Sequence, residues 1–530
     1  MKSFTAEELN DRSKEELIEL LLKTQEQHSQ FIEQLALAKA NRFGRSSEKL
    51  EIEGQVCFFN ETESMFNATW EEPEFEEVVV RHKRKKEVGK REDDLKDFPV
   101  NVVSHELPEE KLNELFGKDN WKRLPDVVYK RLDFRPASYE VQEHHVAVYA
   151  SKDNQTIVKA DRPADLLRNS IVTPSLAAAI MNAKYVNAMP LYRLEQEFQR
   201  NDVCISRQTM ANWMIRLTER YLSLVYDRMK EYLCSTPVIQ VDETPVEVTK
   251  DGRAAGTQSY MWVYRTGQFH ADTPIILYEY QKTRNASHPE RFLKDFSGTA
   301  VCDGYQVYHK MENERTNIRI AGCWAHSRRL FYNVVKTAKG PEKERMKKTV
   351  AYKALRQISA IYHLEGTLEK LSPEERKIRR QLVVKPLVGA FFSWLKEHKD
   401  DVLPEGETGK GITYCLNQEK YLRVFLDDGR IPIDNNASER AIRSFVIGKN
   451  NWKLIDTIHG AQSSAILYSL VETAKANNLK IYDYLTYLLT EIPKHMDGTS
   501  LEFLNDLLPW SEKLPDSCRK KSNKSKGKAT

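Results

Sequence analysis

The sequence lacks paired cysteines, long apolar runs and a strong charge of either sign. Its seven cysteines lie far apart with no CxxC pair, which is typical of a reducing cytosol and argues against a disulfide framework. The most apolar window, 383–395, is interrupted by Lys385 and Pro386 and is too short to span a bilayer. The first residues contain no apolar stretch of a signal peptide. We therefore expect a soluble, cytoplasmic protein with no membrane partner.

Neither charge nor any familiar nucleotide motif indicates a function by itself. The chain has 81 Lys and Arg against 77 Asp and Glu, a net charge of +4 over 530 residues, so a nucleic-acid partner has to be argued from local clusters. No Ser/His/Asp triad and no phosphate-cradling Gly-rich loop is evident in the sequence. At about 150 residues per domain, the length predicts three or four domains.

Three separated acids dominate what the sequence does contain. The β-branched run Val238–Val241 predicts a buried strand that leads into Asp242 and Glu243. A second such run ends at Asp303, and Glu439 falls in the predicted first turn of a helix. Acids at strand ends and on a helix suit a site for divalent cations, because Mg²⁺ prefers oxygen ligands. Glu243 is expected to point to the other side of the extended chain from Asp242.

The order of the predicted elements indicates an α/β protein with an RNase H-like catalytic core. Three strands in a meander come before the first predicted helical crossover, with one acid on the first strand, another on the fourth and the third on a later helix. The long, charged and mostly helical stretch before Glu439 is predicted to be a helical insertion. The predicted strands are 238–241, 259–266, 273–281, 299–303 and 317–323, and the helices begin near 288 and 324.

A helix-turn-helix-like region is predicted upstream of the core. Leu191–Phe198 is followed by a polar turn and then by a helix for which Ser206 is a plausible N-cap. Three polar residues share the outward face of this second helix and could enter a major groove: Arg207, Gln208 and Asn212. Met210, Trp213 and Met214 face inward. Because any two packed helices could produce this layout, base contact by the three polar residues is a hypothesis.

The N-terminal part contains a weak coiled-coil seam. Steps of four and three separate Leu17, Leu21, Thr24, His28, Phe31, Leu35 and Ala38. This spacing predicts a homo-oligomer formed through the N-terminal helix, and the alternative is an amphipathic helix packed on its own domain. Further on, alternation in 139–149 predicts a strand within a small mixed domain.

Shifts in composition give the expected division of the chain. The predicted segments are a helical coiled coil 1–50, a charged linker 51–96, a small mixed domain 97–168, the helix-turn-helix-like region 169–232, the first part of the core 233–335, a helical insertion 336–430, the core helix with Glu439 and its following segment 431–456, a C-terminal helical region 457–510 and a basic disordered tail 511–530.

The three acids predict phosphodiester chemistry with two Mg²⁺ ions, for which Mn²⁺ is an expected substitute. In this hypothesis Asp242 bridges both ions, Asp303 holds one and Glu439 holds the other. Basic residues near the acids are candidates for contact with phosphate or the DNA backbone. His326, Arg328 and Arg329 are at a predicted helix start, where a capping and solvent-facing role is the alternative. Arg440, Arg443 and Lys449 flank Glu439 and could bind a DNA backbone.

Several sequence motifs resemble those of a known protein family. They are Val241-Asp-Glu-Thr-Pro245, Cys302-Asp-Gly-Tyr305, Ala321-Gly-Cys-Trp-Ala-His-Ser-Arg-Arg329, Asp434-Asn-Asn-Ala-Ser-Glu-Arg440 and Gly448-Lys-Asn-Asn-Trp452. With these motifs the sequence resembles the large transposase of the insertion sequence 66 family. The resemblance implies that Asp242, Asp303 and Glu439 form a DDE triad. It also implies assembly on the terminal repeats of a DNA element, with small accessory proteins of the same element.

One departure from that family concerns zinc. The family usually carries a Cys-rich, zinc-ribbon-like segment before the helix-turn-helix region, whereas residues 97–168 contain no cysteine here. The thiolate ligands of such a site are therefore missing, and zinc binding is not expected.

The leading hypothesis is a nucleoid-associated DNA transposase, in which water attacks at the element ends and the freed 3′-hydroxyl attacks target DNA. A nuclease of the same fold that only hydrolyses is an alternative. A non-catalytic, transposase-derived DNA-binding protein is another. A carboxylate-pair glycosidase is remote, since aromatic-lined sugar subsites are not evident.

Overall fold

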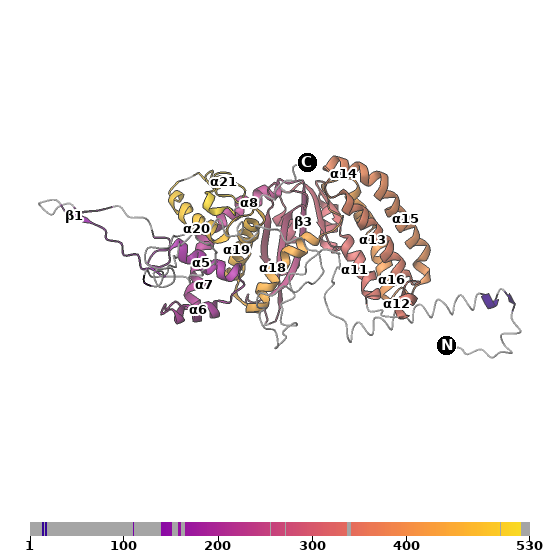
Figure 1. Ribbon diagram of the computed structural model, residues 1–530, viewed down its shortest axis with the longest axis horizontal. Coiled ribbons are helices and arrows are strands. Elements are labelled where there is room, and N and C mark those ends of the chain that lie inside the picture. The colour runs from indigo at the N-terminus through magenta and orange to yellow at the C-terminus, as the bar shows by residue number, and fades with distance from the viewer. Residues whose placement is uncertain are drawn as a thin grey trace. The chain divides into compact units, whose positions relative to one another are not determined.

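The computed structural model describes residues 13–14, 16–18, 110, 139–150, 157–160 and 165–520, without 255, 271, 337–340 and 499 (Figure 1). The linker prediction lies outside these residues, as do almost all of the coiled-coil prediction and most of the small-domain prediction. The chain divides into two compact units, 49–162 and the remainder. In the first unit, β1 (Val148–Ala150) pairs antiparallel with β2 (Ile157–Lys159). The expected strand over 139–149 was too long, because the structure assigns strand only from Val148.

A mixed six-stranded sheet forms the centre of the other unit, so the fold is α/β. Its order is β5-β4-β3-β6-β7, with β8 paired to β3. Strand β3 pairs antiparallel with β4 and parallel with β6. The strands are β3 (Val238–Lys250), β4 (Gln258–Thr266), β5 (Ile276–Gln281), β6 (Gly298–Cys302), β7 (Ile318–Gly322) and β8 (Ile455–Thr457). The short strand β8, parallel to the far end of β3, was not predicted.

Helices lie on both sides of this sheet, with α5–α8 and α19–α21 on one side and α11–α16 on the other (Figure 1). Before it come α5 (Pro174–Tyr185), α6 (Leu191–Arg200), α7 (Arg207–Leu217), η2 (Thr218–Leu222) and α8 (Ser223–Cys234). Between and after the strands lie α9 (Ser287–Phe292), α10 (Gln306–Glu314) and α11 (Trp324–Val335). Helix α10, between Asp303 and β7, was missed in the sequence.

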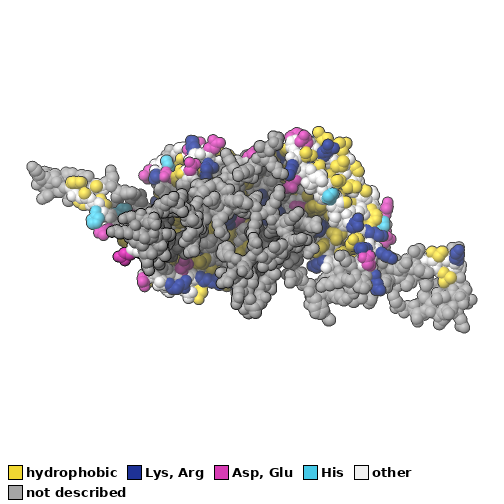
Figure 2. All heavy atoms as spheres, in the orientation of Figure 1, with side chains coloured by type: hydrophobic (Ala, Val, Ile, Leu, Met, Phe, Trp, Pro, Cys, Tyr) yellow, Lys and Arg dark blue, Asp and Glu magenta, His cyan; other side chains and the backbone are white. Residues whose placement is uncertain are grey.

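A helical segment then separates α11 from the helix that carries Glu439. It comprises α12 (Pro341–Met346), α13 (Val350–Leu368), α14 (Pro373–Arg379), η3 (Arg380–Val384), α15 (Lys385–His398), η4 (Lys399–Asp401), α16 (Glu407–Asn417), α17 (Glu419–Leu422) and η5 (Val424–Leu426). On the face in Figure 2, hydrophobic side chains gather over α14 and α15. Exposed apolar residues of this stretch are Ile378, Leu382, Val383 and Leu387.

The last helices pack back on the sheet. They are α18 (Asn436–Trp452), α19 (Ile458–Ala476), α20 (Ile481–Glu491), η6 (Ile492–His495), α21 (Leu504–Leu507) and η7 (Asp516–Cys518). Helix α19 covers the edge strand β5: Thr473 Oγ1 accepts from the Ile276 N–H at 3.0 Å, and Ser469 Oγ accepts from the Tyr278 N–H at 2.7 Å. These hydroxyls satisfy backbone groups that an open sheet edge leaves unpaired.

Alternation along β3 places the two faces of the sheet in different hydrophobic clusters. Val238 packs in the cluster that includes Trp324 of α11. Ile239 and Val241 belong to the cluster built from α5–α8, the sheet and α18–α20. Because side chains alternate along a strand, Gln240 and Asp242 share the face of Val238. The first strand is therefore buried on both sides up to the point where its acids begin.

The C-terminal prediction needs a correction. Residues 511–520 are not disordered: the Lys480 N–H donates to the Cys518 carbonyl at 2.8 Å, and the Lys520 N–H donates to Asn478 at 3.0 Å. Leu514 and Cys518 are buried, and the basic composition hid these two apolar anchors. Residues 521–530 lie outside the described residues. No helix in the described part of the chain has the length and apolar character that a membrane crossing requires.

Candidate active site

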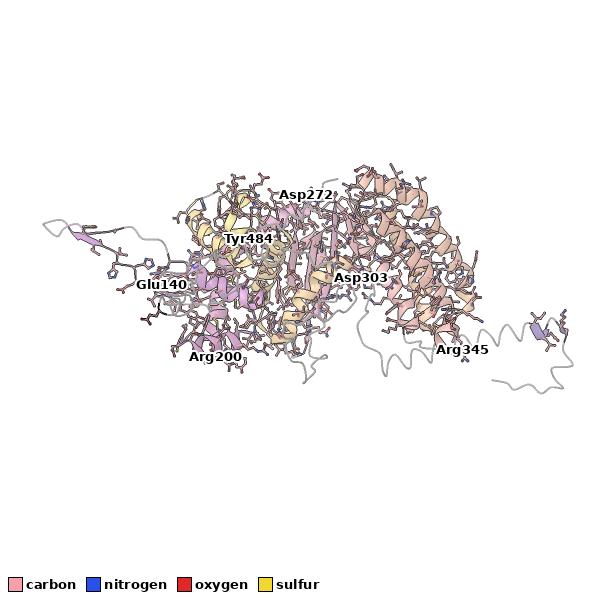
Figure 3. The ribbon with its side chains drawn as sticks, viewed as in Figure 1. Glu140, Arg200, Asp272, Asp303, Arg345 and Tyr484 are labelled. Atoms are coloured by element: carbon pink, nitrogen blue, oxygen red, sulfur yellow. The ribbon has the colours of Figure 1, made fainter. Side chains whose placement is uncertain are left out.

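The sheet register brings the first two acids together. The parallel pairing of β3 and β6 ends at Gln240 and Val301, and two further residues along each chain reach Asp242 and Asp303. Adjacent strands lie about 4.8 Å apart, and residues two apart share a face. Asp303 follows the end of β6 directly, where Figure 3 labels it. Its Oδ1 accepts from the Tyr305 N–H at 3.0 Å, which closes the turn into α10.

Asp242 experiences the charges of all the neighbouring acids. Burial raises the pKa of its carboxyl group well above the usual value, and the negative charge of Glu243 raises this pKa further. Asp303 and Glu439 also raise the pKa of Asp242, whereas the Glu243 N–H, which donates to Asp242 Oδ1 at 2.9 Å, opposes the shift. The structure thus brings the three sequence-predicted acids within electrostatic reach of one another.

The start of α18 is tied to β3 by a buried amide. Asn435 Nδ2 donates to the Val241 carbonyl at 2.7 Å, directly before Asp242. Its Oδ1 accepts from Gln240 Nε2 at 3.3 Å. Asn435 is only 1 % exposed, and Glu439 lies in the first turn that follows. Asn435 therefore sets the position of the third acid relative to the first.

Two further elements hold the segment before α18. The backbone N–H of Trp324, at the start of α11, donates to the Ile433 carbonyl at 3.2 Å. The Tyr362 hydroxyl of α13 donates to Asp434 Oδ2 at 2.9 Å. Asp434 Oδ1 also accepts from the Asn436 N–H at 3.0 Å, two residues further along the chain. Sequence reasoning quoted Asp434 and Asn435 only as parts of a motif, since their partners lie far away in the chain.

The basic residues of α11 approach the acids to different degrees. Arg329 binds both carboxylate oxygens of Glu439, at 3.0 and 3.1 Å. Burial lowers the pKa of His326, and Arg329 lowers it further, while Asp303 and Glu439 oppose the shift. Arg328 is half-buried, with its guanidinium 5.3 Å from the centre of the Tyr332 ring. His326 and Arg329 thus lie at the acid cluster.

Glu243 contacts a different set of partners from Asp242, as alternation predicts. Its carboxylate accepts hydrogen bonds from Arg284 and, at 2.9 Å, from the Tyr308 hydroxyl of α10. Arg284 also lies 3.8 Å from Asp303 Oδ2 and stacks on Tyr305, 3.8 Å from the ring centre. Glu243 is therefore linked to Asp303 through a shared guanidinium. No sequence signal singled out Arg284.

The basic residues of α18 divide into two groups. Arg440 and Arg443 are exposed and free to face a ligand. Lys449 is half-buried, and its Nζ donates to the Pro245 carbonyl of β3 at 2.7 Å. Burial lowers the pKa of Lys449. Lys449 therefore helps to fix α18 against β3, whatever else it contacts.

The helix-turn-helix-like pair is present as α6 and α7. Ser206 caps α7 by accepting from the Thr209 N–H at 3.1 Å. Arg207, Gln208 and Asn212 are exposed, and Met210, Trp213 and Met214 are buried. The outward and inward faces of α7 are thus those that the sequence predicts.

The donors of the acid cluster fit a divalent cation by type. Carboxylate oxygens are what Mg²⁺ prefers, and the pKa of Asp242 is raised first by burial and then by the neighbouring negative charges. Among the residues that the structure describes, no three acid, imidazole or thiolate groups stand close enough to enclose an ion as arranged. Both carboxylate oxygens of Glu439 accept hydrogen bonds from Arg329.

Comparison with known proteins identifies the family. Residues 169–463 match the family described as Transposase IS66 family, and 469–510 match its IS66 C-terminal element. Residues 30–103, outside the described residues, match a region described as Transposase C of IS166 homeodomain. A transposase role and a DNA partner are therefore supported.

Two relatives come from Sinorhizobium fredii (strain NBRC 101917 / NGR234). Uncharacterized protein y4jD is 29% identical over 400 residues, which cover 74% of this chain and 76% of the relative. Uncharacterized protein y4qI is 30% identical over 396 residues, which cover 73% of this chain and 71% of the relative. With more than half of its length matched by the family, the chain belongs to the Transposase IS66 family.

Proposed function

We propose that this protein is a DDE transposase that cleaves DNA at the ends of an insertion sequence and joins the freed 3′ ends to target DNA. The observation that carries the proposal is the convergence of Asp242, Asp303 and Glu439, whose charges meet at Asp242. They arrive from β3, the end of β6 and α18. Acids this close repel one another, and a bound cation relieves that repulsion.

We further propose that the sheet is an RNase H-like core. Its order, β5-β4-β3-β6-β7, has a three-stranded antiparallel meander followed by two parallel strands. Residues 336–430 would then be a helical insertion between the last core strand and α18. The topology and the acid positions together support this assignment.

In the proposed site Asp242, Asp303 and Glu439 would hold two Mg²⁺ or Mn²⁺ ions. When bound, these ions supply a lowered pKa for attacking water and charge neutralisation at the reacting phosphate. Zinc has no proposed role.

The surrounding basic side chains would contact the DNA backbone. Arg329, once released from Glu439, offers a forked donor that matches a phosphate. The lowered pKa of His326 favours a neutral imidazole near pH 7, so it would contribute a hydrogen bond rather than charge. Exposed Arg440 and Arg443 extend this contact along α18, and Lys449, on the same helix, fixes α18 against β3.

Recognition of the element ends is proposed for the second helix of the α6–α7 pair. Arg207, Gln208 and Asn212 form an exposed polar face, and residues of these types read base edges in a major groove. We also propose that the N-terminal helix forms a homo-oligomer, with small accessory proteins of the element joining the assembly at the nucleoid.

The test compares Asp242→Asn, Asp303→Asn and Glu439→Gln with the wild type on labelled DNA bearing the element ends. Each variant is expected to keep DNA binding and to lose more than about 100-fold in Mg²⁺-dependent cleavage, beyond what loss of a supporting residue costs. Asp272→Asn is the matched control, because Asp272 is exposed and lies away from the cluster in Figure 3.

Full cleavage by any of the three variants would contradict the triad. Two further outcomes point to the alternatives. If the wild type cleaves but does not join pre-cut ends, the protein is a nuclease that only hydrolyses. If it binds the ends without nicking them in Mg²⁺ or Mn²⁺, it is a DNA-binding protein.

A further inference from the structure

A pocket with two basic side chains lies away from the acid cluster, between the start of α6 and the end of α18. It has a volume of about 410 Å³ and is lined by Lys184, Pro190, Leu191, Tyr192, Arg193, Asn451 and Trp452. No carboxylate lines this pocket, although two basic side chains do. These lining residues indicate a negatively charged ligand.

Lys184 is the first reason for this assignment. Its Nζ lies 4.1 Å from the centre of the Trp452 ring and 5.6 Å from that of Tyr185. In the part of the chain that the structure describes, no carboxylate acts on the pKa of Lys184, for which burial is the only cause of a shift. Burial lowers its pKa to about 8. The aromatic ring compensates only part of the lost hydration, so an anion beside the ammonium would be favoured.

The N-terminus of α6 is the second reason. This helix of 10 residues starts after Pro190 without a side-chain cap, and its first turn contains no acidic residue. The backbone N–H groups at such a start carry partial positive charge and bind phosphate readily. Arg193, in the same turn, is exposed and lines the pocket. Helix start, Lys184 and Arg193 therefore bring positive charge to one place.

The backbone beside the pocket contains two non-glycine residues with positive φ. Asn451 Nδ2 donates to the Ala188 carbonyl at 2.8 Å, which ties the end of α18 to the α5–α6 loop. Ala188 has a φ of 54°, and Lys453, after Trp452, has a φ of 65°. Such backbone conformations are costly for non-glycine residues and gather at binding sites.

Trp452 is also fixed by its neighbours. At Gly448 a Cβ atom would lie 2.3 Å from the Trp452 ring, so the indole packs where only glycine leaves room. The ring thus forms a rigid floor beneath the Lys184 ammonium.

We propose that this pocket binds a phosphate of the DNA backbone. The proposal rests on the proposed function, and it adds a contact outside both the acid cluster and the exposed face of α7. Because α18 carries Glu439 at one end and Trp452 at the other, a duplex held here would run along α18 past Arg440 and Arg443. The α6–α7 pair and the acid cluster would then be linked by one bound strand.

The test measures how the affinity for a duplex of about 30 base pairs depends on salt. Lys184→Gln and Arg193→Gln are each expected to make the slope of log K against log[salt] less negative by about one and to weaken binding at low salt. Arg345→Gln, on α12, removes an equal charge from an exposed side chain labelled in Figure 3. This control is expected to leave the slope unchanged.

The possible outcomes separate the hypotheses. If the wild type binds duplex DNA and both folded variants keep its slope, the pocket proposal is wrong and the proposed function stands. If the wild type binds no DNA, the pocket proposal and the proposed function are both wrong.

Titration with inorganic phosphate, followed by ³¹P NMR, tests whether the pocket binds free phosphate instead of a DNA phosphate. Binding of free phosphate with an unchanged DNA slope would make this a small-anion site and overturn the proposal. Arg193 is exposed, so its variant remains informative if Lys184→Gln unfolds, which thermal melting would reveal.

Discussion

The pKa of Asp242 is raised by burial first and by the charges of Glu243, Asp303 and Glu439 after that. A carboxyl group whose folded pKa exceeds its unfolded value stabilises the fold only below the unfolded pKa, and this stabilisation is lost as pH rises through the folded pKa. At neutral pH, where the carboxyl group of the unfolded chain is ionised, the raised pKa of Asp242 therefore destabilises the fold, as expected where stability is given up for function.

Asp242→Asn is accordingly expected to stabilise the protein while abolishing cleavage. The gain should appear as a higher melting temperature at pH 7 and should shrink toward pH 4, where the carboxyl group of the unfolded chain also becomes protonated. Thermal melting at several pH values measures it. Asp456→Asn is the control, because the hydrogen bond from Lys250 lowers the pKa of Asp456 and outweighs the opposing effect of burial. An equal gain at pH 4 and pH 7 would contradict the electrostatic cause.

At the scale of elements, the site depends on where α18 begins. Asn435 joins this start to β3 through bonds that span 194 and 195 residues of sequence, and Tyr278 of β5 donates its hydroxyl to the Ala441 carbonyl at 2.7 Å. Helix α18 can therefore hold Glu439 beside Asp242 although the two residues come from distant parts of the chain. Lys449 adds a further contact with β3.

Asn435→Ala is expected to displace Glu439 from its place beside Asp242 while the fold is kept. Removing the amide leaves a buried Gln240 donor without one of its partners, at a cost of about 1–3 kcal/mol. We expect cleavage to fall by about 10- to 100-fold with unchanged DNA binding, measured on the same labelled ends. Asn417→Ala, at the exposed end of α16, is the control. Loss of DNA binding in parallel with cleavage would indicate general unfolding instead.

At the scale of the whole molecule, the helices between α11 and α18 brace the site from outside the sheet. Arg380 of η3 is fully buried and binds both carboxylate oxygens of Glu365 on α13. Its Nη1 also donates to the carbonyls of Phe425 and Ile431, at 2.6 and 2.9 Å. Ile431 lies close before Asp434 in the chain, so this buried pair supports the segment that positions α18.

Arg380→Met is expected to cost about 3–5 kcal/mol, because it leaves Glu365 buried without its partner. Cleavage should be lost with the support of α18. The double variant Arg380→Met, Glu365→Leu should recover part of the stability, because it removes the uncompensated charge. Chemical denaturation of the single and double variants measures both effects. A double variant no more stable than the single one would show that the ion pair is not the source of the loss.

Features that depend on residues close together in the sequence could be predicted, whereas contacts between distant residues could not. The faces of α7, the cap at Ser206 and the strand leading to Asp242 all depend on residues a few positions apart, so periodicity and local hydrogen bonding predicted them. Helix α10 and the ordered residues 511–520 were missed because their polar composition obscured a few apolar anchors, Tyr308 and Met311 in one case and Leu514 and Cys518 in the other.

The sequence by itself determined which residue types stand at the strand ends and at the start of α18, and with them the three candidate acids. Only the tertiary structure decided that Arg284 serves both Glu243 and Asp303, that Asn435 ties α18 to β3, and that Lys184 meets Trp452 in a pocket. These contacts join residues separated by tens to hundreds of positions. Such pairs leave no periodic trace in one sequence, because their geometry exists only after the sheet and its helices have packed.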